Sequence, residues 1–182
     1  MAHSRPLVLA LSLCAALPAL ADECAVSKSV NVHGPLRVGA PAPEFGGWLP
    51  SNELFSSARF MKERAGQAVV VSFFASWCKP CQKGLPVLQK LNDELKGRAS
   101  VVLVAFGHDR DEVKAYLEGK DITLPVVLDT YKKQSQKFGV DTALPRTFVV
   151  DAGGKLVAAF ECEGPDFAEQ LKAAVTRATA AK

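Results

Sequence analysis

The residues with the clearest chemistry in this chain are two cysteines three positions apart, Cys78 and Cys81. They follow an apolar run from Val69 to Phe74, whose β-branched and aromatic residues predict a buried strand. After the cysteines, leucines recur at helical spacing, at Leu85, Leu88, Leu91 and Leu95. A CxxC pair between a strand and a helix is typical of thiol redox chemistry, because the two sulfurs can join or part there.

The predicted helix gives the two cysteines different roles. Cys78 stands at the helix N-terminus, where free backbone N–H groups and the helix dipole favour a thiolate. Lys79 adds a positive charge, and Pro80 suits a first helical turn, where no intrahelical N–H bond is lost. We therefore expect Cys78 to be the exposed nucleophile and Cys81, one turn deeper, to be the resolving thiol.

Two other uses of a CxxC pair fit the sequence less well. A structural zinc site takes CxxC as half of its ligands and needs a second pair, whereas the remaining cysteines and histidines here are scattered singly. A purely structural disulfide would close a very short loop and remove little entropy from the unfolded chain. The spacing therefore favours a redox pair.

Three segments resemble one known family. Residues 73–81, with sequence FFASWCKPC, and the following Pro86 resemble the active-site segment of thioredoxin-like proteins, in particular the exported TlpA/ResA-like thiol-disulfide oxidoreductases. Residues 38–45 resemble the family's N-terminal VGxxAPxF segment, and residues 144–154 resemble its xPxTFxID-xxG stretch. The resemblance covers about residues 36 to 175.

The resemblance implies a fold and an activity. The fold is α/β and thioredoxin-like, with a mixed central sheet flanked by helices and a TlpA-like strand-helix insertion between residues 106 and 145. The activity is thiol-disulfide exchange on exported proteins, as a reductant in cytochrome c maturation or similar work. Pro145 resembles the family's cis-proline opposite the CxxC, and the backbone of Leu144 would pair with a substrate peptide. Trp77, together with Lys79 and Pro80, would shape the surface that meets the partner.

The sequence departs from its relatives at two positions near the cysteines. Thioredoxin has a buried Asp six residues before the first cysteine, where this chain has Ser72. ResA-like proteins have a Glu three residues after the second cysteine, where this chain has Gly84. A neutral site beside Lys79 favours the Cys78 thiolate, which stabilises the reduced form and makes the pair more oxidising.

Two further classes stay open. A copper-handling module would use Cys78 and Cys81 as soft ligands. Resemblance to copper chaperones of this fold would call for a CxxxC motif and a distal His, whereas the spacing here is CxxC. A thiol peroxidase would need a single peroxidatic cysteine in a Thr/Ser-rich turn, which the Trp-Cys-Lys-Pro-Cys segment does not resemble. We expect no cofactor and no metal. His108 reads as a solvated loop histidine.

Length and charge limit the range of partners. A chain of 182 residues predicts one globular domain, placed here at residues 36–182 after a flexible segment at 22–35. The formal net charge of +3 gives no reason to expect nucleic acid or an anionic membrane surface as a partner. The expected partners are the thiols and disulfides of exported proteins and an upstream redox protein. The sequence does not indicate an oligomeric state.

The first 21 residues have the pattern of a cleaved signal peptide. Leu7 to Leu17 is apolar but too short to span a bilayer, and Ala19-Leu20-Ala21 is an A-x-A cleavage motif. The alternative is an uncleaved anchor. Cleavage would leave the protein without stable membrane insertion. It would place the protein in the periplasm or another extracytoplasmic space, and disulfides persist in such compartments.

Hydrophobic periodicity predicts the remaining elements. Besides the strand at 69–74 and the helix after it, we expect strands at 100–106 and 125–128 and a hairpin of 147–150 with 156–160. We expect helices at 53–63, capped by Ser51 or Asn52, and at 109–117, 130–138 and from 164 onward.

The cleavage motif generates a first prediction. Protein recovered from the cell envelope should lack Met1 to Ala21, because the signal peptidase would cut before Asp22. Intact-mass measurement checks this, and a mass that retains these residues would indicate an anchored protein.

The spare cysteines generate a second prediction. Cleavage would remove Cys14 and leave Cys24 and Cys162 beside the CxxC pair. We hypothesise a structural disulfide between them, against a free or intermolecular Cys24 and a buried Cys162. Peptide mapping under non-reducing conditions should recover one linked peptide, and two free thiols would end the hypothesis.

Overall fold

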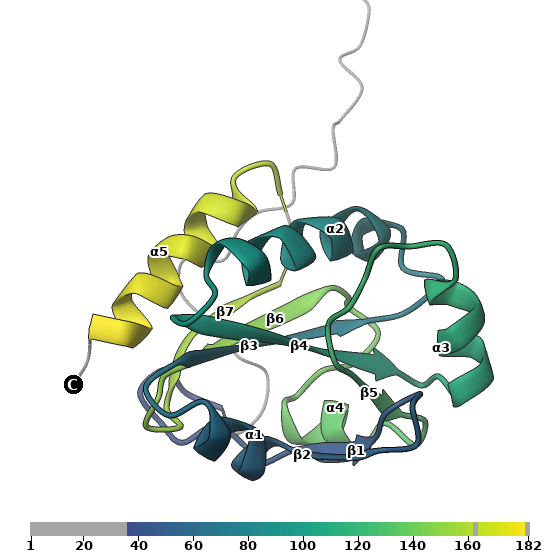
Figure 1. Ribbon diagram of the computed structural model, residues 1–182, viewed down its shortest axis with the longest axis horizontal. Helices are drawn as coiled ribbons and strands as arrows, with labels where there is room; N and C mark the ends of the chain where they lie inside the picture. Colours follow the sequence, from purple (N-terminus) through teal and green to yellow (C-terminus); the bar gives the residue numbers. More distant parts are fainter. Residues whose placement is uncertain (1–35, 162–163, 181–182) are drawn as a thin grey trace, which may run out of the picture.

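The computed structural model of the protein describes residues 36–161 and 164–180 (Figure 1). The predicted signal peptide, the segment at 22–35 and the predicted pairing of Cys24 with Cys162 lie outside the described residues. Within the described ranges, no helix has both the length and the apolar character needed to cross a membrane.

A five-stranded mixed sheet forms the centre of the molecule (Figure 1). Its strands lie in the order β5-β4-β3-β6-β7. Strand β3 pairs in parallel with β4 and β4 with β5, whereas β6 runs antiparallel to both β3 and β7. The strand bounds are Ala68–Phe74 for β3, Ala99–Phe106 for β4, Val126–Asp129 for β5, Arg146–Val150 for β6 and Leu156–Phe160 for β7.

Helices and a small hairpin cover the two faces of this sheet. Helices α2 (Lys79–Glu94) and α5 (Phe167–Ala180) lie on one face, and α3 (Arg110–Leu117) contributes Val113 to the same hydrophobic cluster. Helices α1 (Ser57–Glu63) and α4 (Lys133–Lys137) lie on the other face, together with the hairpin of β1 (Gly46–Trp48) and β2 (Leu54–Ser56). Because both faces are covered, all seven residues of β3 are buried.

The alternation of side chains along β3 divides the core into two clusters. Val70 and Phe74 pack into the cluster under α2 and α5, whereas Val71 and Phe73 pack into the cluster on the opposite face. This pattern follows from strand geometry, because successive side chains of a strand point to opposite faces of the sheet. The continuous apolar run in the sequence is therefore the signature of a central strand, as predicted.

Helix α2 is held on the sheet by the leucines at helical spacing. Leu85, Leu88, Leu91 and Leu95 are each no more than 2% exposed. Burial of each such side chain stabilises the fold by roughly 1.5–3 kcal/mol. Only the turn at residues 75–78 separates the helix from β3, so this packing fixes the helix N-terminus near the end of the central strand.

The predicted helix at 53–63 is wrong in its first part. Residues Leu54–Ser56 form strand β2, which pairs with β1 (Gly46–Trp48), and the helix begins only at Ser57. A Cβ on Gly46 would lie 2.6 Å from the Phe55 carbonyl oxygen, so glycine is what allows the two strands to approach. The sequence pattern missed this hairpin because each strand has three residues.

The helix expected at 130–138 is also shorter than predicted. It spans Lys133–Lys137 because the buried Asp129 carboxylate accepts the backbone N–H groups of Gln134 and Ser135, at 2.9 and 2.8 Å. That contact fixes the helix start. The hairpin of β6 and β7, and the strand-helix insertion formed by β5 and α4, agree with the prediction.

Candidate active site

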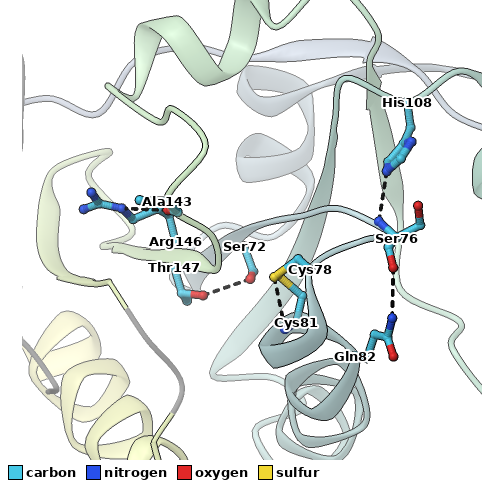
Figure 2. The surroundings of a disulfide bond; sticks show 9 residues. All are labelled: Ser72, Ser76, Cys78, Cys81, Gln82, His108, Ala143, Arg146 and Thr147. Carbon is cyan, nitrogen blue, oxygen red and sulfur yellow. Dashed lines mark hydrogen bonds between the residues drawn. A yellow bond between two sulfur atoms is a disulfide. The ribbon is translucent and has the colours of Figure 1, made fainter. Parts of the chain in front are cut away.

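The two cysteines of the CxxC motif are joined in a disulfide at the start of α2 (Figure 2). Cys78 is the N-cap residue, and its Cα lies 5.3 Å from that of Cys81. The Cys81 backbone N–H donates to the Cys78 sulfur at 3.2 Å. Pro80 lies in the first helical turn, as predicted, where it costs no intrahelical bond. A sulfur on the N-cap residue thus meets the free amide of the first turn, which is the arrangement that stabilises a thiolate.

The prediction that Cys78 is exposed is wrong for this disulfide-bonded form. Its exposed fraction is 4% and that of Cys81 is 2%. The bond to Cys81 directs the Cys78 side chain toward the helix, and both residues belong to the hydrophobic cluster that includes Phe74 and Ala75. The sulfur pair is therefore part of the core beneath α2.

An exposed aromatic side chain marks the surface next to the cysteines. Trp77 is 56% exposed, and its ring packs edge-on against Phe106 at 6.4 Å between centroids. The Lys132 ammonium lies over the Phe106 ring, 4.8 Å from its centre. Lys79 is exposed as well. Trp77 thus leaves an exposed indole beside the cysteines, and Lys132 lies over the Phe106 ring that the indole packs against.

Two hydroxyl groups occupy the place beside the disulfide where thioredoxin has a carboxylate. Ser72 on β3 is paired in register with Thr147 on β6, and their Oγ atoms lie 2.8 Å apart (Figure 2). Both side chains are buried, each 1% exposed. Gly84 is buried in α2 and has no side chain to contribute. The positions that the sequence singled out as neutral are therefore buried and lack a carboxylate of their own.

The predicted substrate-binding loop lies at the same end of the sheet. The Leu144–Pro145 peptide bond is cis. Because β6 runs antiparallel to β3, its first residue, Arg146, pairs with Phe73 near the end of β3 where α2 begins. Pro145 is buried and Leu144 is half-buried. The topology thus brings Leu144 and Pro145 to the end of the sheet that carries the cysteines.

Sequence reasoning missed Arg146, which fixes that loop. Its side chain is only 8% exposed, its Nε donates to the Ala143 carbonyl at 3.2 Å, and its guanidinium forms an ion pair with Glu161 at 2.5 Å. A planar, permanently charged group suits a buried pair of this kind. The available signal was a lone arginine at the start of a strand that is apolar in its last three residues.

The assignment of His108 as a solvated histidine is wrong. The side chain is buried, and its Nε2 atom accepts the Ser76 backbone N–H at 2.9 Å (Figure 2). Ser76 lies two residues before Cys78. His108 comes from the end of β4, so the parallel pairing of β3 and β4 places it beside the turn that leads into the CxxC motif. Nothing in the local sequence showed this contact.

The buried hydroxyl pair generates a prediction about proton affinity. Ser72→Asp places a carboxylate beside the cysteines, and like-charge coupling should raise the apparent pKa of the reduced pair by about one unit or more. Thiolate absorbance titration measures this shift. Ser72→Asn is the matched neutral control and should leave the titration close to wild type. Equal titrations for the two variants would show that position 72 does not couple to the sulfurs.

Comparison with known proteins agrees with this geometry. The model of the AhpC/TSA family matches residues 38–159. The thiol-disulfide oxidoreductase ResA of Bacillus thuringiensis is 29% identical over 139 residues, which are 75% of this chain and 76% of that protein.

Solved structures give the same result. A thiol:disulfide interchange protein of the thioredoxin family from Chlorobium tepidum is 29% identical, covers 80% of this chain and 99% of its own, and superposes with a TM-score of 0.63. A structure from the same organism described as DsbE is 23% identical with a TM-score of 0.71 over 80% of this chain and 99% of its own, and bears on the fold alone. These findings confirm the thioredoxin-like α/β fold and the thiol-disulfide oxidoreductase activity. The chain belongs to the AhpC/TSA family of thioredoxin-like proteins.

Proposed function

We propose that this oxidoreductase acts on exported proteins and reduces their disulfides, as in cytochrome c maturation or similar work. Cys78 is the nucleophile and Cys81 the resolving thiol. The observation that carries the proposal is the disulfide at the helix N-terminus, with the Cys81 N–H directed at the Cys78 sulfur. That amide stays in place when the disulfide is reduced and then stabilises the Cys78 thiolate.

The reaction has two exchange steps. The Cys78 thiolate attacks one sulfur of a substrate disulfide, a mixed disulfide forms, and the second substrate sulfur leaves as a thiolate that takes a proton. The Cys81 thiolate then attacks the Cys78 sulfur and releases the other substrate thiolate. Two electrons pass to the substrate, and the protein is left with the Cys78–Cys81 disulfide seen in the structure. An upstream thiol partner would reduce it again by the same chemistry.

The surface around the pair supports a protein substrate. The exposed Trp77 supplies an apolar contact, and Lys79 supplies charge at the mouth of the site. Leu144 is half-buried beside the buried Pro145, where its backbone would pair with an extended substrate segment. In the disulfide-bonded form Cys78 and Cys81 are nearly covered, so an upstream thiol must reach the bond between them across this surface.

The direction of exchange depends on the environment and on the upstream partner. A site with Ser72 in place of a carboxylate favours the reduced form, which raises the potential of the pair. Such a pair still reduces a substrate disulfide of higher potential when an upstream thiol donor keeps the pair in its reduced form. We therefore keep the reductive role that the family resemblance implies.

Export is part of the proposal and is supported by the sequence of the first 21 residues. The same reading assigns residues 22–35 to a flexible segment and 36–182 to the catalytic domain, in the periplasm or another extracytoplasmic space. Protein thiols and disulfides in that space are the proposed partners.

The assigned roles generate a trapping prediction. Cys81→Ser should accumulate mixed disulfides with exported proteins, because the first exchange proceeds and the second is blocked. Cys78→Ser should accumulate none. Non-reducing electrophoresis followed by mass spectrometry of the adducts checks both variants and identifies the partners.

Other outcomes would change the assignment. Equal trapping by the two variants would show that the roles are not divided as proposed. If neither variant traps a partner and the reduced protein binds Cu(I) tightly in metal analysis, the copper-handling alternative replaces the proposal. Rapid consumption of peroxide would instead favour a thiol peroxidase.

A further inference from the structure

A buried histidine that takes no part in the exchange steps contacts the turn before the nucleophile. His108 is 6% exposed, and its Nε2 lies 2.9 Å from the Ser76 backbone nitrogen. Ser76 donates its N–H, so Nε2 must be the unprotonated ring nitrogen and Nδ1 carries the hydrogen. The imidazole is therefore neutral and acts as an acceptor.

The other ring nitrogen of His108 lies beside a carboxylate. Nδ1 is 3.3 Å from the Oε2 atom of Glu112 but forms no hydrogen bond with it, and that oxygen accepts the Asp109 backbone N–H at 2.8 Å in the capping box of α3. The backbone of His108 is fixed as well, because its carbonyl accepts the Thr130 hydroxyl at 2.9 Å. The acceptor atom thus has a defined position at the end of β4.

The Ser76 residue is held at both of its backbone polar groups. Its N–H is bound by His108, and its carbonyl oxygen accepts the Gln82 side-chain N–H at 2.9 Å (Figure 2). The next residues are Trp77 and Cys78, and the Cys78 N–H donates to the Ala75 carbonyl at 3.1 Å. Because Cys78 is a non-helical N-cap, its orientation is set by this turn as well as by the helix.

We propose that His108 is a positioning residue for thiol-disulfide exchange: as the acceptor of the Ser76 N–H, its neutral imidazole fixes the turn that presents Cys78. The inference rests on the proposed role of Cys78 as nucleophile. A small misplacement of a reacting atom is costly in rate, so loss of the acceptor should slow the attack even where the fold survives. A buried histidine that served packing alone would be replaceable by an apolar residue of similar size.

The test compares two substitutions of similar size in the full-length protein. In His108→Gln the side-chain carbonyl can accept the Ser76 N–H, whereas in His108→Leu it cannot. The readout is the second-order rate constant with which the pre-reduced protein attacks a disulfide-bonded model peptide, together with the thiolate titration of Cys78. We expect His108→Leu to be slower by about tenfold or more and to have a shifted titration. His108→Gln should stay close to wild type on both measures.

Two results would overturn the inference. His108→Leu could react at the wild-type rate, or His108→Gln could be as slow as His108→Leu, which would show that the acceptor is not what matters. If His108→Leu fails to fold, Gln82→Met and its control Gln89→Met decide. Gln82 holds the other side of Ser76, whereas Gln89 contacts Thr123 away from the turn. The Gln82→Met protein should attack the peptide disulfide more slowly than the Gln89→Met protein. Equal rates would contradict the inference that the hydrogen bonds to the Ser76 backbone position Cys78.

Failure of the proposed function is distinguishable from failure of this inference. If wild-type protein does not attack the peptide disulfide, or Cys78→Ser attacks it as fast, the assignment of Cys78 is wrong before any His108 variant is compared. If wild type reacts and Cys78→Ser does not, only the comparison of the His108 variants tests the positioning role.

Discussion

The burial of one face of α2 against the central sheet is the constraint on which the site depends. Leu88 and Leu91 of α2 pack in one hydrophobic cluster with side chains of β3, and each leucine is almost fully buried. Several such contacts, at roughly 1.5–3 kcal/mol each, hold the helix axis in place. Its N-terminus therefore has a fixed position at the end of β3, and Cys78 sits on that terminus. The sulfur chemistry is located by apolar packing, and the polar groups adjust it.

Those polar groups come from strands far apart in the sequence. Pairing of β3 with β6 brings Ser72 to Thr147 and places Pro145 near the start of α2. Pairing of β3 with β4 brings His108 to the turn before Cys78. The result is a sulfur pair in a buried setting where hydroxyls replace the carboxylate of thioredoxin. The helix N-terminus then acts on the thiolate without an opposing buried charge at position 72.

The sequence predicted the parts of this arrangement that depend on local pattern. The apolar run of β3, the leucine face of α2 and the CxxC pair between them each follow from periodicity or spacing, and the mixed sheet flanked by helices follows from the family resemblance. It did not predict the hairpin of β1 and β2, whose strands are too short to show alternation. The burial of His108 and Arg146 was also missed, because each depends on a partner from another strand or loop. The exposure predicted for Cys78 was wrong for the disulfide-bonded form, in which both cysteines lie in the core cluster beneath α2.

The central claim is that a helix N-terminus in a site without a carboxylate at position 72 stabilises the reduced form of the Cys78–Cys81 pair. The most direct test is a redox titration of the full-length protein in glutathione buffers, with the disulfide fraction measured after acid quenching. The account predicts a midpoint potential less negative than about −270 mV, the value of thioredoxin, and on the reducing side of about −120 mV, that of a strong oxidant. A midpoint at or below the thioredoxin value would contradict this claim. The site without a carboxylate at position 72 would then not stabilise the Cys78 thiolate in the way that the claim requires.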